Sequence, residues 1–536
     1  MGRKFRSAAA PGQPMLMPAD PREWLPPGHL AWRVLEMAAG MDLSRFGAGC
    51  RRDGQGGRPY DPAMMAALLL YCYCRGRRSS REIEMATFDD VGARIICGGL
   101  HPDHSTVAEF VRRNLAAVLA LLPESVRACA AEGLVSLDVV AGDGTKLKAN
   151  ASMASNVTAA QLDAQIAELE ALIDAELRQW AQDMLGGPAP AGSPGSGPGG
   201  DGPGGGDRGG AGRKKPARAE QTLARRQAAR AQLRARQQDK RREELSPKIA
   251  GLAARVQKKE AAVARREQKV RARLEARARR AAAGEKIGGR APITSADQDR
   301  DLRELRAALA RTRADHQAAL AAAAAFGDPD ATARVNTADP ASRVMPLKKG
   351  GFDQLHNVQA LATAKTQVIL AVTRHPSPAD VQALQALLAE ARRVLDEAGI
   401  NGQIQKALFD AGYASDANFT ADIPQTLYVA VTREGRQTGR SADGRAPQTM
   451  LPSWQEMTAR LASDEGKALY RQRAATIEPV FAQLTARLGR TLNYRGSLAD
   501  AELALWAASH NILKAITARA RRLARTTATA PAPAAA

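Results

Sequence analysis

Three carboxylates, Asp143, Asp410 and Glu478, have sequence contexts suited to metal-dependent chemistry on phosphodiesters. Asp143 and Asp410 each follow a short apolar run that predicts a buried strand, and Glu478 lies in a segment with helical periodicity. Cleavage of a phosphodiester needs an activated water and relief of charge on the phosphate, which two metal ions roughly 4 Å apart provide. Mg²⁺, or Mn²⁺ in its place, prefers hard oxygen ligands, so three carboxylates suffice without Cys or His.

Two strands and a helix must bring these carboxylates together. The run LVSLDVVAGD is nearly continuous in apolar residues and predicts a strand that ends at Asp143. KALFDAGYAS predicts a short strand that ends at Asp410, with Gly412 supplying the turn. Adjacent strands lie about 4.8 Å apart, which would bring the two Asp side chains close. An Asp at a strand end is more often a cap or turn residue, so the residues alone leave both interpretations open.

Further elements surround these strands. Residues 358–375 predict two adjacent strands with a turn near Ala364-Lys365, and residues 379–398 predict a helix. Residues 426–433 predict another strand, and the chain is expected to be helical from about 467 to 516. Strands and helices therefore resume one pattern on either side of residues 156–330, which we interpret as an insertion.

Residues 1–130 predict a compact helical module. Asp61-Pro62 opens an apolar helix, Ser79 and Ser80 cap a second one, and residues 103–106 open a third. Arg112 and Arg113 stay outside the apolar face of the third helix. Short helices with external arginines can dock on DNA, but a purely supporting helical domain is an equal alternative.

The insertion is expected to be a coiled coil. Its first seam consists of apolar residues at alternating steps of three and four: Leu162, Ile166, Leu169, Ile173, Leu177, Trp180 and Met184. Residues 186–217 then predict a disordered linker, because its Gly/Pro-rich core offers few apolar side chains and has no phosphate-binding motif. Ser246-Pro247 predicts a new helix start, followed by Val or Ile at every seventh position and a third helix with Leu302, Leu305 and Leu309.

The positive charge of the chain is concentrated in this insertion. Lys and Arg outnumber Asp and Glu by 77 to 56, a net charge of +21. Residues 213–290 alone hold 26 basic and 8 acidic residues, a net +18. This charge favours a clamp on the DNA backbone, against the alternative of a solvated coiled-coil surface. A membrane surface is the weaker interpretation, since no stretch approaches about 18 uncharged apolar residues, and we expect a cytoplasmic, nucleoid-associated protein.

Five cysteines, few and odd in number, argue against a disulfide framework. Cys97, His101 and His104 could be drawn as a zinc site, but a fourth ligand at suitable spacing is missing.

The contexts of the three carboxylates resemble those of bacterial insertion-sequence DDE transposases of the branch with a Tyr-Arg-Glu-Lys signature. The motifs are A-G-D-G-T-K-L-K-A-N-A-S around Asp143, F-D-A-G-Y around Asp410, and Y-R-Q-R-A-A-T-I-E-P-V-F around Glu478. Weaker similarity extends over most of residues 20–515. The resemblance implies Asp143, Asp410 and Glu478 as catalytic metal ligands, and Tyr470 and Arg473 as contacts to DNA near the scissile phosphate.

The signature is incomplete. Four residues separate Arg473 from Glu478 where three are usual, and Thr485 stands where the signature Lys is expected. Arg487 or Arg490 could take the place of that Lys. A catalytically inactive DNA-binding protein of the same fold, or a simple nuclease, therefore remains the competing interpretation.

The expected architecture is an α+β or α/β chain whose ribonuclease-H-like mixed-sheet core is interrupted by the helical insertion. Its parts are an N-terminal helical domain (1–130), the core (131–155 and 331–520), the insertion (156–330) and a disordered tail (521–536). The expected partner is double-stranded DNA, both element ends and target. Because two ends must be held together, we expect a homodimer on DNA and no membrane association.

Overall fold

The computed structural model describes residues 20–47, 59–186, 214–284, 295–324, 330, 332–347, 350–431 and 451–529. The chain divides into two compact units. The first unit joins residues 1–153 to residues 341–536, and the second comprises residues 154–340. Each unit is described by itself below.

The first unit begins with short helices that pack into one apolar core. They are α1 (Leu30–Ala39), α2 (Pro62–Cys74), α3 (Ser80–Asp89), α4 (Val91–Ile96), α5 (His104–Arg113) and α6 (Leu115–Ala131). The predicted helix starts are confirmed: the Asp61 side chain accepts from the backbone N–H of Ala63 at 2.8 Å. Ser79 and Glu82 form a reciprocal capping box on α3. These caps satisfy backbone N–H groups that the first turns leave unpaired.

The third predicted helix is broken into α5 and α6 at Asn114, where the axis bends by 79°. Asn114 leaves the helical conformation (φ −107°, ψ 32°) and donates from Nδ2 to the carbonyl of Phe110 at 2.9 Å. This side-chain bond competes with the helical ladder, which periodicity alone could not reveal. In the described part of the chain no single helix is long and apolar enough to cross a membrane, although α5 and α6 together meet those criteria.

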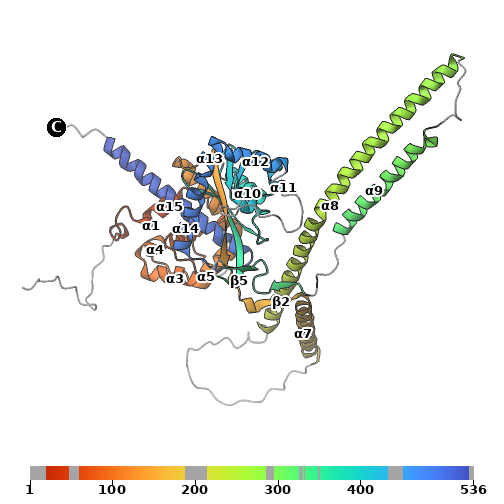
Figure 1. The fold of residues 1–536 in the computed structure, drawn as a ribbon. Coiled ribbons are helices and arrows are strands. Elements are labelled where there is room, and N and C mark those ends of the chain that lie inside the picture. Colours follow the sequence, from red (N-terminus) through yellow and green to blue (C-terminus); the bar gives the residue numbers. More distant parts are fainter. Residues whose placement is uncertain are drawn as a thin grey trace, which may run out of the picture. The chain divides into compact units, whose positions relative to one another are not determined.

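A six-stranded mixed sheet forms the centre of the first unit (Figure 1). Its strands are β1 (Val139–Lys148), β4 (Arg343–Pro346), β5 (Phe352–Thr363), β6 (Ile369–His375), β7 (Lys406–Phe409) and β8 (Thr426–Val429). β1 lies between β5, to which it runs antiparallel, and β7, to which it runs parallel. β4 and β6 both pair antiparallel with β5, and β8 pairs parallel with β7. The first unit therefore combines a helical N-terminal part with a mixed sheet.

Helices cover both faces of this sheet. They are α10 (Ala383–Glu397), α11 (Asp416–Phe419), α12 (Pro452–Ala462), α13 (Asp464–Tyr470), α14 (Gln472–Leu488) and α15 (Ser497–Thr529). α14 and α15 pack on the face that carries Thr145 and Leu147. The other face carries Gln359, which reaches Asp380 just before α10. The buried side chains of the sheet, of these helices and of the N-terminal helices form a single core cluster.

Several boundaries differ from the prediction. β1 does not end at Asp143 but continues to Lys148, because its second half keeps pairing with β5. β8 ends at Val429, and residues 432–450 lie outside the described residues. α15 continues to Thr529, so residues 521–529 of the predicted disordered tail are helical. Residues 530–536 lie outside the described residues.

The second unit contains a two-stranded sheet and three long helices. They are β2 (Asn156–Thr158), β3 (Arg334–Asn336), α7 (Ala159–Gly186), α8 (Lys214–Ala282) and α9 (Arg300–Ala324). The predicted helix start at Ser246-Pro247 is wrong, because α8 runs through it without a break. Most of the predicted linker lies outside the described residues, but α8 begins inside it.

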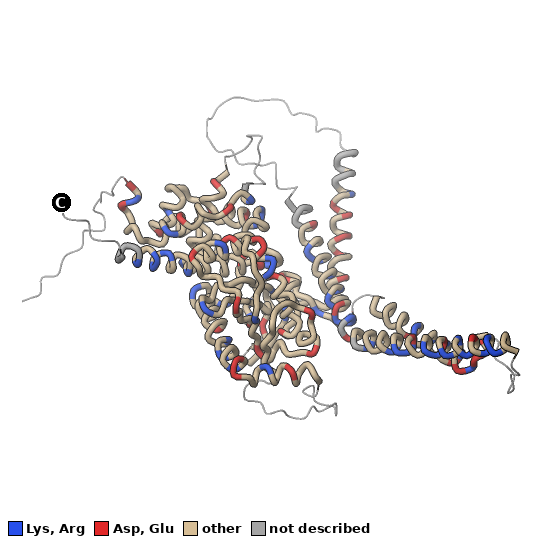
Figure 2. Tube along the Cα trace, turned by 90° about the horizontal axis from the view of Figure 1, so that it is seen from above, with Lys and Arg blue, Asp and Glu red and all other residues tan. Residues whose placement is uncertain are grey.

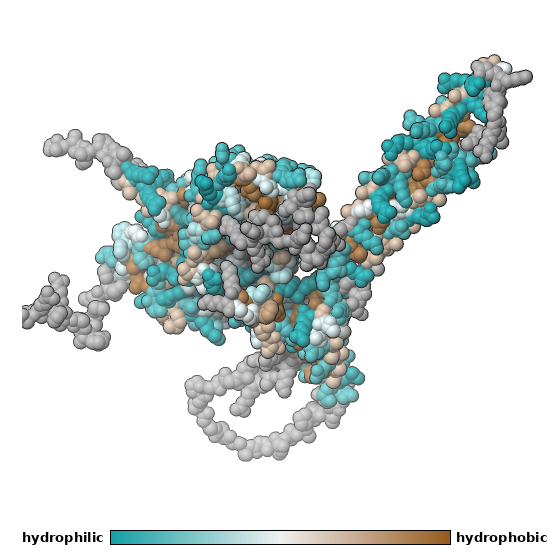
Figure 3. All heavy atoms as spheres, viewed as in Figure 1, coloured by the Kyte–Doolittle hydropathy of each residue, from teal (hydrophilic) through white to brown (hydrophobic). Residues whose placement is uncertain are grey.

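The helices of the second unit pack through short apolar seams. Val263 of α8 is buried against Leu302 and Leu309 of α9, as the heptad spacing predicts. The α7 seam is buried at its start, where Leu162 packs against α8, whereas Leu177 is 52% exposed. The α8–α9 pair is mostly hydrophilic in the view of Figure 3, and Figure 2 shows Lys and Arg recurring along α8.

Candidate active site

Asp143 lies in the middle of the central strand β1, opposite Ala360 of β5. Side chains alternate along a strand, so Asp143 shares a face with Thr145 and Leu147, the face covered by α14 and α15. Pairing between β1 and β7 stops at Ala141, two residues before Asp143. The carboxylate therefore sits just beyond the point where the parallel strands part.

Asp410 follows β7 directly and caps the short 3₁₀ turn Ala411–Tyr413. Its Oδ1 accepts from the backbone N–H of Gly412 at 2.9 Å. The β1–β7 register pairs Ala141 with Leu408, so two more steps bring Asp410 beside Asp143. Neighbouring strands lie about 4.8 Å apart, which makes these two residues neighbours at the end of the parallel pairing.

The two carboxylates influence each other electrostatically. Burial and then the charge of Asp410 raise the pKa of Asp143 to about 6. A 2.7 Å hydrogen bond from the backbone N–H of Gly144 and the nearby Arg473 oppose this rise without cancelling it. Negative charge at this position is therefore undercompensated by the protein, which is the condition that attracts a cation.

Glu478 and Arg473 come from α14, at the same face of the sheet. Arg473 Nη1 lies 3.4 Å from Asp143 Oδ2, and its Nη2 lies 3.9 Å from Glu478 Oε1. The Arg473 guanidinium also lies 5.9 Å from the centre of the Tyr470 ring. Burial lowers the pKa of Arg473, but Tyr470, Asp143 and Asp410 outweigh it, so that pKa is raised. Arg473 thus contacts Asp143 and Glu478 and also interacts through its charge with Asp410.

The oxygen donors at this place fit a hard divalent cation. Asp143 and Asp410 are adjacent carboxylates whose mutual repulsion the nearby Arg473 only partly offsets, and their oxygens are the hard donors that such a cation prefers. Glu478 has a side chain that is 64% exposed and turned toward Arg473. Accordingly, no three His, Cys, Asp or Glu side chains are gathered around one point among the described residues. The oxygens of Asp143 and Asp410 fit the cation by chemistry, and Glu478 would have to turn toward them to add a third carboxylate.

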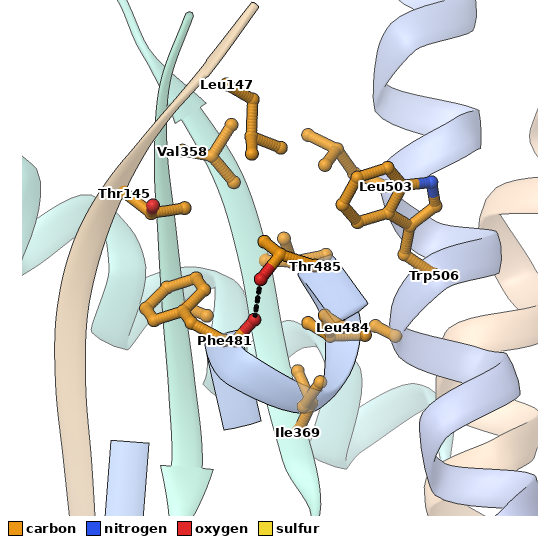
Figure 4. A pocket seen from close by; sticks show the side chains of 12 residues that line it. Thr145, Leu147, Val358, Ile369, Phe481, Leu484, Thr485, Leu503 and Trp506 are labelled. Atoms are coloured by element: carbon orange, nitrogen blue, oxygen red, sulfur yellow. Dashed lines mark hydrogen bonds between the residues drawn. The ribbon is translucent and has the colours of Figure 1, made fainter. Parts of the chain in front are cut away.

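Thr485, at the position of the expected Lys, lines a small apolar cavity between the sheet and helices α14 and α15 (Figure 4). Its hydroxyl donates to the backbone carbonyl of Phe481 at 2.8 Å. Arg487 lies half-buried, and its Nη2 donates to the Ser509 hydroxyl of α15 at 3.2 Å. Burial lowers the pKa of Arg487. The contact of Arg487 with DNA stays a prediction. The contact that the structure shows, with Ser509, lies inside the fold.

Arg112 and Arg113 end α5 and are exposed. Both form ion pairs with Glu109 on the same helix. Exposed pairs of this kind hold a side chain weakly, so both arginines can turn to a DNA phosphate, and this contact also stays a prediction.

The zinc alternative finds no support in the described residues. His101 Nδ1 lies 3.1 Å from the Thr87 hydroxyl, and His104 Nδ1 lies 2.8 Å from Glu84 Oε2. The described cysteines are free and buried: Cys72, Cys74, Cys97 and Cys129. Burial raises the pKa of the Cys97 thiol to about 12, which disfavours the thiolate that zinc requires.

A fourth carboxylate, Asp380, was missed by the sequence reasoning. It lies in the segment between β6 and α10, and its charge contributes to the raised pKa of Asp143. Its Oδ1 accepts hydrogen bonds from Asn357 and Gln359 on β5. Asn357 and Gln359, two buried amides at alternate positions of β5, were the signal that could have found this cluster, because a buried amide needs a partner.

Two family comparisons match parts of the chain. A transposase domain family (DUF772) matches residues 20–113, and a transposase DDE domain family matches residues 439–516. The second match includes Tyr470, Arg473 and Glu478. A search of curated proteins and a search of solved structures found no match.

Proposed function

We propose that this chain, which the two family matches identify as an insertion-sequence DDE transposase, cuts the ends of its element and joins them to target DNA with the help of Mg²⁺ or Mn²⁺. Asp143, Asp410 and Glu478 are the proposed catalytic metal ligands. The observation that carries this proposal is the contact of one side chain, Arg473, with both Asp143 and Glu478. It supports the convergence of β1 and α14 on one site.

The sheet supports a ribonuclease-H-like core. Asp143 belongs to its central strand, Asp410 follows the parallel neighbour of that strand, and Glu478 belongs to a helix packed on the same face. Each carboxylate thus lies on, or directly after, a strand or helix. Sites built on such rigid elements hold their ligands more precisely than sites on loops. The domain limits drawn from the sequence remain part of the proposal.

Two divalent cations, when bound, would activate the attacking oxygen and neutralise charge on the phosphate and on the leaving oxygen. Asp143, Asp410 and Glu478 would hold them. Arg473 lies beside Asp143, is positively charged, and can donate hydrogen bonds from its N–H groups to a phosphate oxygen. Tyr470 lies next to Arg473 and would orient the DNA. In the proposed sequence water attacks the phosphodiester at the element end, and the freed 3′-hydroxyl then attacks target DNA.

The basic second unit would bind the DNA backbone. α8 carries its exposed Lys and Arg over a length of 69 residues, while its apolar positions face α9 and α7. Many phosphate contacts of this kind supply affinity without sequence preference. We further propose a homodimer on paired ends, because two ends must be held for joining. A monomer both free and on paired ends in light scattering would contradict this part of the proposal.

The test of the catalytic assignment is Asp143→Asn. The variant should lose Mg²⁺-dependent cleavage of a DNA fragment carrying the element end, and should bind that fragment as tightly as the wild type. Asp138→Asn is the matched control, because Asp138 is exposed just before β1 and should cut normally. A normal cutting rate for Asp143→Asn would refute the assignment of Asp143 as a catalytic metal ligand. Wild-type protein that releases cut ends without joining them to target DNA would favour a nuclease.

One observation favours the alternative of an inactive DNA-binding protein. Thr485 offers no positive charge where the family has Lys, and its hydroxyl is bonded within α14. A wild-type protein that binds element ends but neither cuts nor joins them in Mg²⁺ or Mn²⁺ would favour this alternative.

A further inference from the structure

The two glycines that flank Asp143 make room for side chains on the opposite face of β1. A Cβ at Gly144 would stand 2.5 Å from Gln359 Nε2 and 2.9 Å from Asp380 Oδ1. A Cβ at Gly142 would collide with the ring of Phe409. A Cβ at either glycine would stand closer to these side chains than real Cβ contacts do, so it would displace Gln359 and Asp380 at Gly144 or Phe409 at Gly142. The Gly-Asp-Gly sequence thus lets three side chains approach the backbone directly behind Asp143.

Two of these approaching side chains support the turn that carries Asp410. Phe409 immediately precedes Asp410, and its ring packs against that of Tyr413 with centroids 4.8 Å apart. Tyr413 closes the turn that Asp410 caps and is fully buried. Its hydroxyl donates to Gln359 Oε1. The Asp410 turn is therefore tied to β5 at the residue that pairs with Gly144.

Asp380 fixes the orientation of the Gln359 amide. Gln359 Nε2 donates to Asp380 Oδ1 and to Asn357 Oδ1, both at 2.8 Å. Asn357 Nδ2 donates to the same Asp380 oxygen at 2.9 Å. An ionised carboxylate only accepts, so it holds the NH₂ end of the amide and leaves Oε1 facing Tyr413. Lys146 balances the charge, with Nζ 3.5 Å from Asp380 Oδ1.

We propose that Asp380, Gln359 and Tyr413 are positioning residues that set the separation between Asp143 and Asp410 for a shared divalent cation. The chain of contacts runs from Asp380 through Gln359 to Tyr413 and so to the Asp410 turn, on the face of the sheet away from α14. None of the three need touch the cation or the DNA. This inference rests on the proposed function, since it assumes that Asp143 and Asp410 bind one cation.

The test is the affinity of the full-length protein for Mn²⁺ alone, measured by calorimetry. Tyr413→Phe removes one oxygen and Asp380→Ala removes the acceptor of Gln359, and each should weaken Mn²⁺ binding by about 10- to 100-fold. Asp380→Asn keeps an acceptor oxygen in place and should retain most of the affinity. Tyr428→Phe, a buried tyrosine of β8, is the matched control and should bind normally. Affinity for the DNA end should stay unchanged in all four variants.

Three outcomes would overturn the inference. Normal Mn²⁺ affinity in Tyr413→Phe and Asp380→Ala, with affinity lost in Asp143→Asn, would refute the positioning role and leave the proposed function standing. Equal losses in Asp380→Asn and Asp380→Ala would assign the effect to the charge of Asp380. Normal Mn²⁺ affinity in Asp143→Asn would refute the proposed function and this inference with it. Thermal unfolding of each variant identifies any loss of Mn²⁺ affinity that comes from misfolding. If Asp380→Ala misfolds, the Mn²⁺ affinity of Tyr413→Phe, the smallest change, decides whether the positioning role holds.

Discussion

Arg473 on α14 reaches Asp143 on β1 with Nη1 3.4 Å from Oδ2, across a separation of 330 residues in the chain. The same guanidinium lies 3.9 Å from Glu478, so the Arg473 side chain contacts two of the three proposed catalytic carboxylates. Its Nε is buried and has no hydrogen-bond partner among the described residues, which leaves one donor of this side chain available there. A phosphate oxygen at the site would provide an acceptor for it.

Removal of this guanidinium should slow strand cleavage. We expect Arg473→Ala to lower the single-turnover cleavage rate by about 100-fold or more, the effect of deleting one stabilising donor at a reacting group. Arg473→Lys should recover only part of the rate, because an ammonium cannot span Asp143 and Glu478 as a planar fork does. Arg471→Ala, an exposed neighbour, should cut normally. An unchanged rate in Arg473→Ala would leave Arg473 as a structural residue.

Removal of one partner from the buried ion pair between Arg78 and Glu502 should strongly destabilise the fold. Glu502 is fully buried and accepts from Arg78 Nη1 at 3.1 Å and from the backbone of Asn493 at 2.7 Å. Glu502→Ala leaves the Arg78 charge buried and unpaired, so it should cost about 3–5 kcal/mol in the free energy of unfolding. Urea denaturation measures this cost.

The control for that measurement is Glu456→Ala. Glu456 forms an ion pair with Arg460, but its side chain is largely exposed, so its removal should cost less than about 1 kcal/mol. Equal costs for the two variants would contradict the importance of the buried pair.

His510 should make stability depend on pH. Burial lowers the pKa of His510 to about 4 in the folded chain, where its Nε2 donates to the Gln367 carbonyl at 2.9 Å. The unfolded chain takes up this proton near pH 6.5, so the folded state is at its full advantage above pH 6.5 and loses it as the pH falls toward 4. By pH 5 the loss should be about 2 kcal/mol.

His510→Gln keeps a donor of similar reach and removes the titration. The difference in unfolding free energy between the wild type and this variant, followed by urea denaturation from pH 7.5 to 4.5, isolates the contribution of His510 from that of other groups. A difference that does not change with pH would show that His510 is not held neutral.

The exposed Lys and Arg side chains of α8 should govern the salt dependence of DNA binding. Four exposed residues replaced together by Gln, which preserves helix propensity, serve as the variant: Lys258, Arg265, Lys269 and Arg271. If each contacts one phosphate, the slope of log affinity against log salt concentration should fall by about 3 to 4. Exchange of Lys for Arg and Arg for Lys at the same positions keeps the charge and should keep the slope. An unchanged slope in the Gln variant would favour a solvated coiled-coil surface.

Local signals in the sequence predicted most elements near the site. Asp61 was expected to cap α2, and Asp410 to end a strand, because both depend on neighbouring residues. The break at Asn114 was missed, since the apolar periodicity continues across it and the change lies in the backbone angles of one residue. The sequence predicts a helix start at Ser246-Pro247, whereas α8 runs through both residues as one helix.

Contacts between side chains far apart in the chain could not be predicted from the sequence. The neighbouring position of Asp143 and Asp410 followed from the strand prediction, whereas the contact of Arg473 with Asp143 needs the fold, because an insertion lies between them. Asp380 falls within the predicted helix 379–398, whereas α10 begins only at Ala383, so Asp380 lies in the segment before it. Its importance became visible only when Gln359 and Asn357 were found to converge on it.

The uninterrupted course of α8 through Ser246-Pro247 gives the insertion a definite reach. At 1.5 Å per residue, its 69 residues form a rod about 100 Å long. Duplex DNA rises about 3.4 Å per base pair, so this rod is as long as about 30 base pairs, or nearly three helical turns. A helix divided at Pro247 would give two shorter, independently oriented segments. Helix α8 is therefore one continuous rod, and the surface it offers along its length matches about 30 base pairs of duplex DNA.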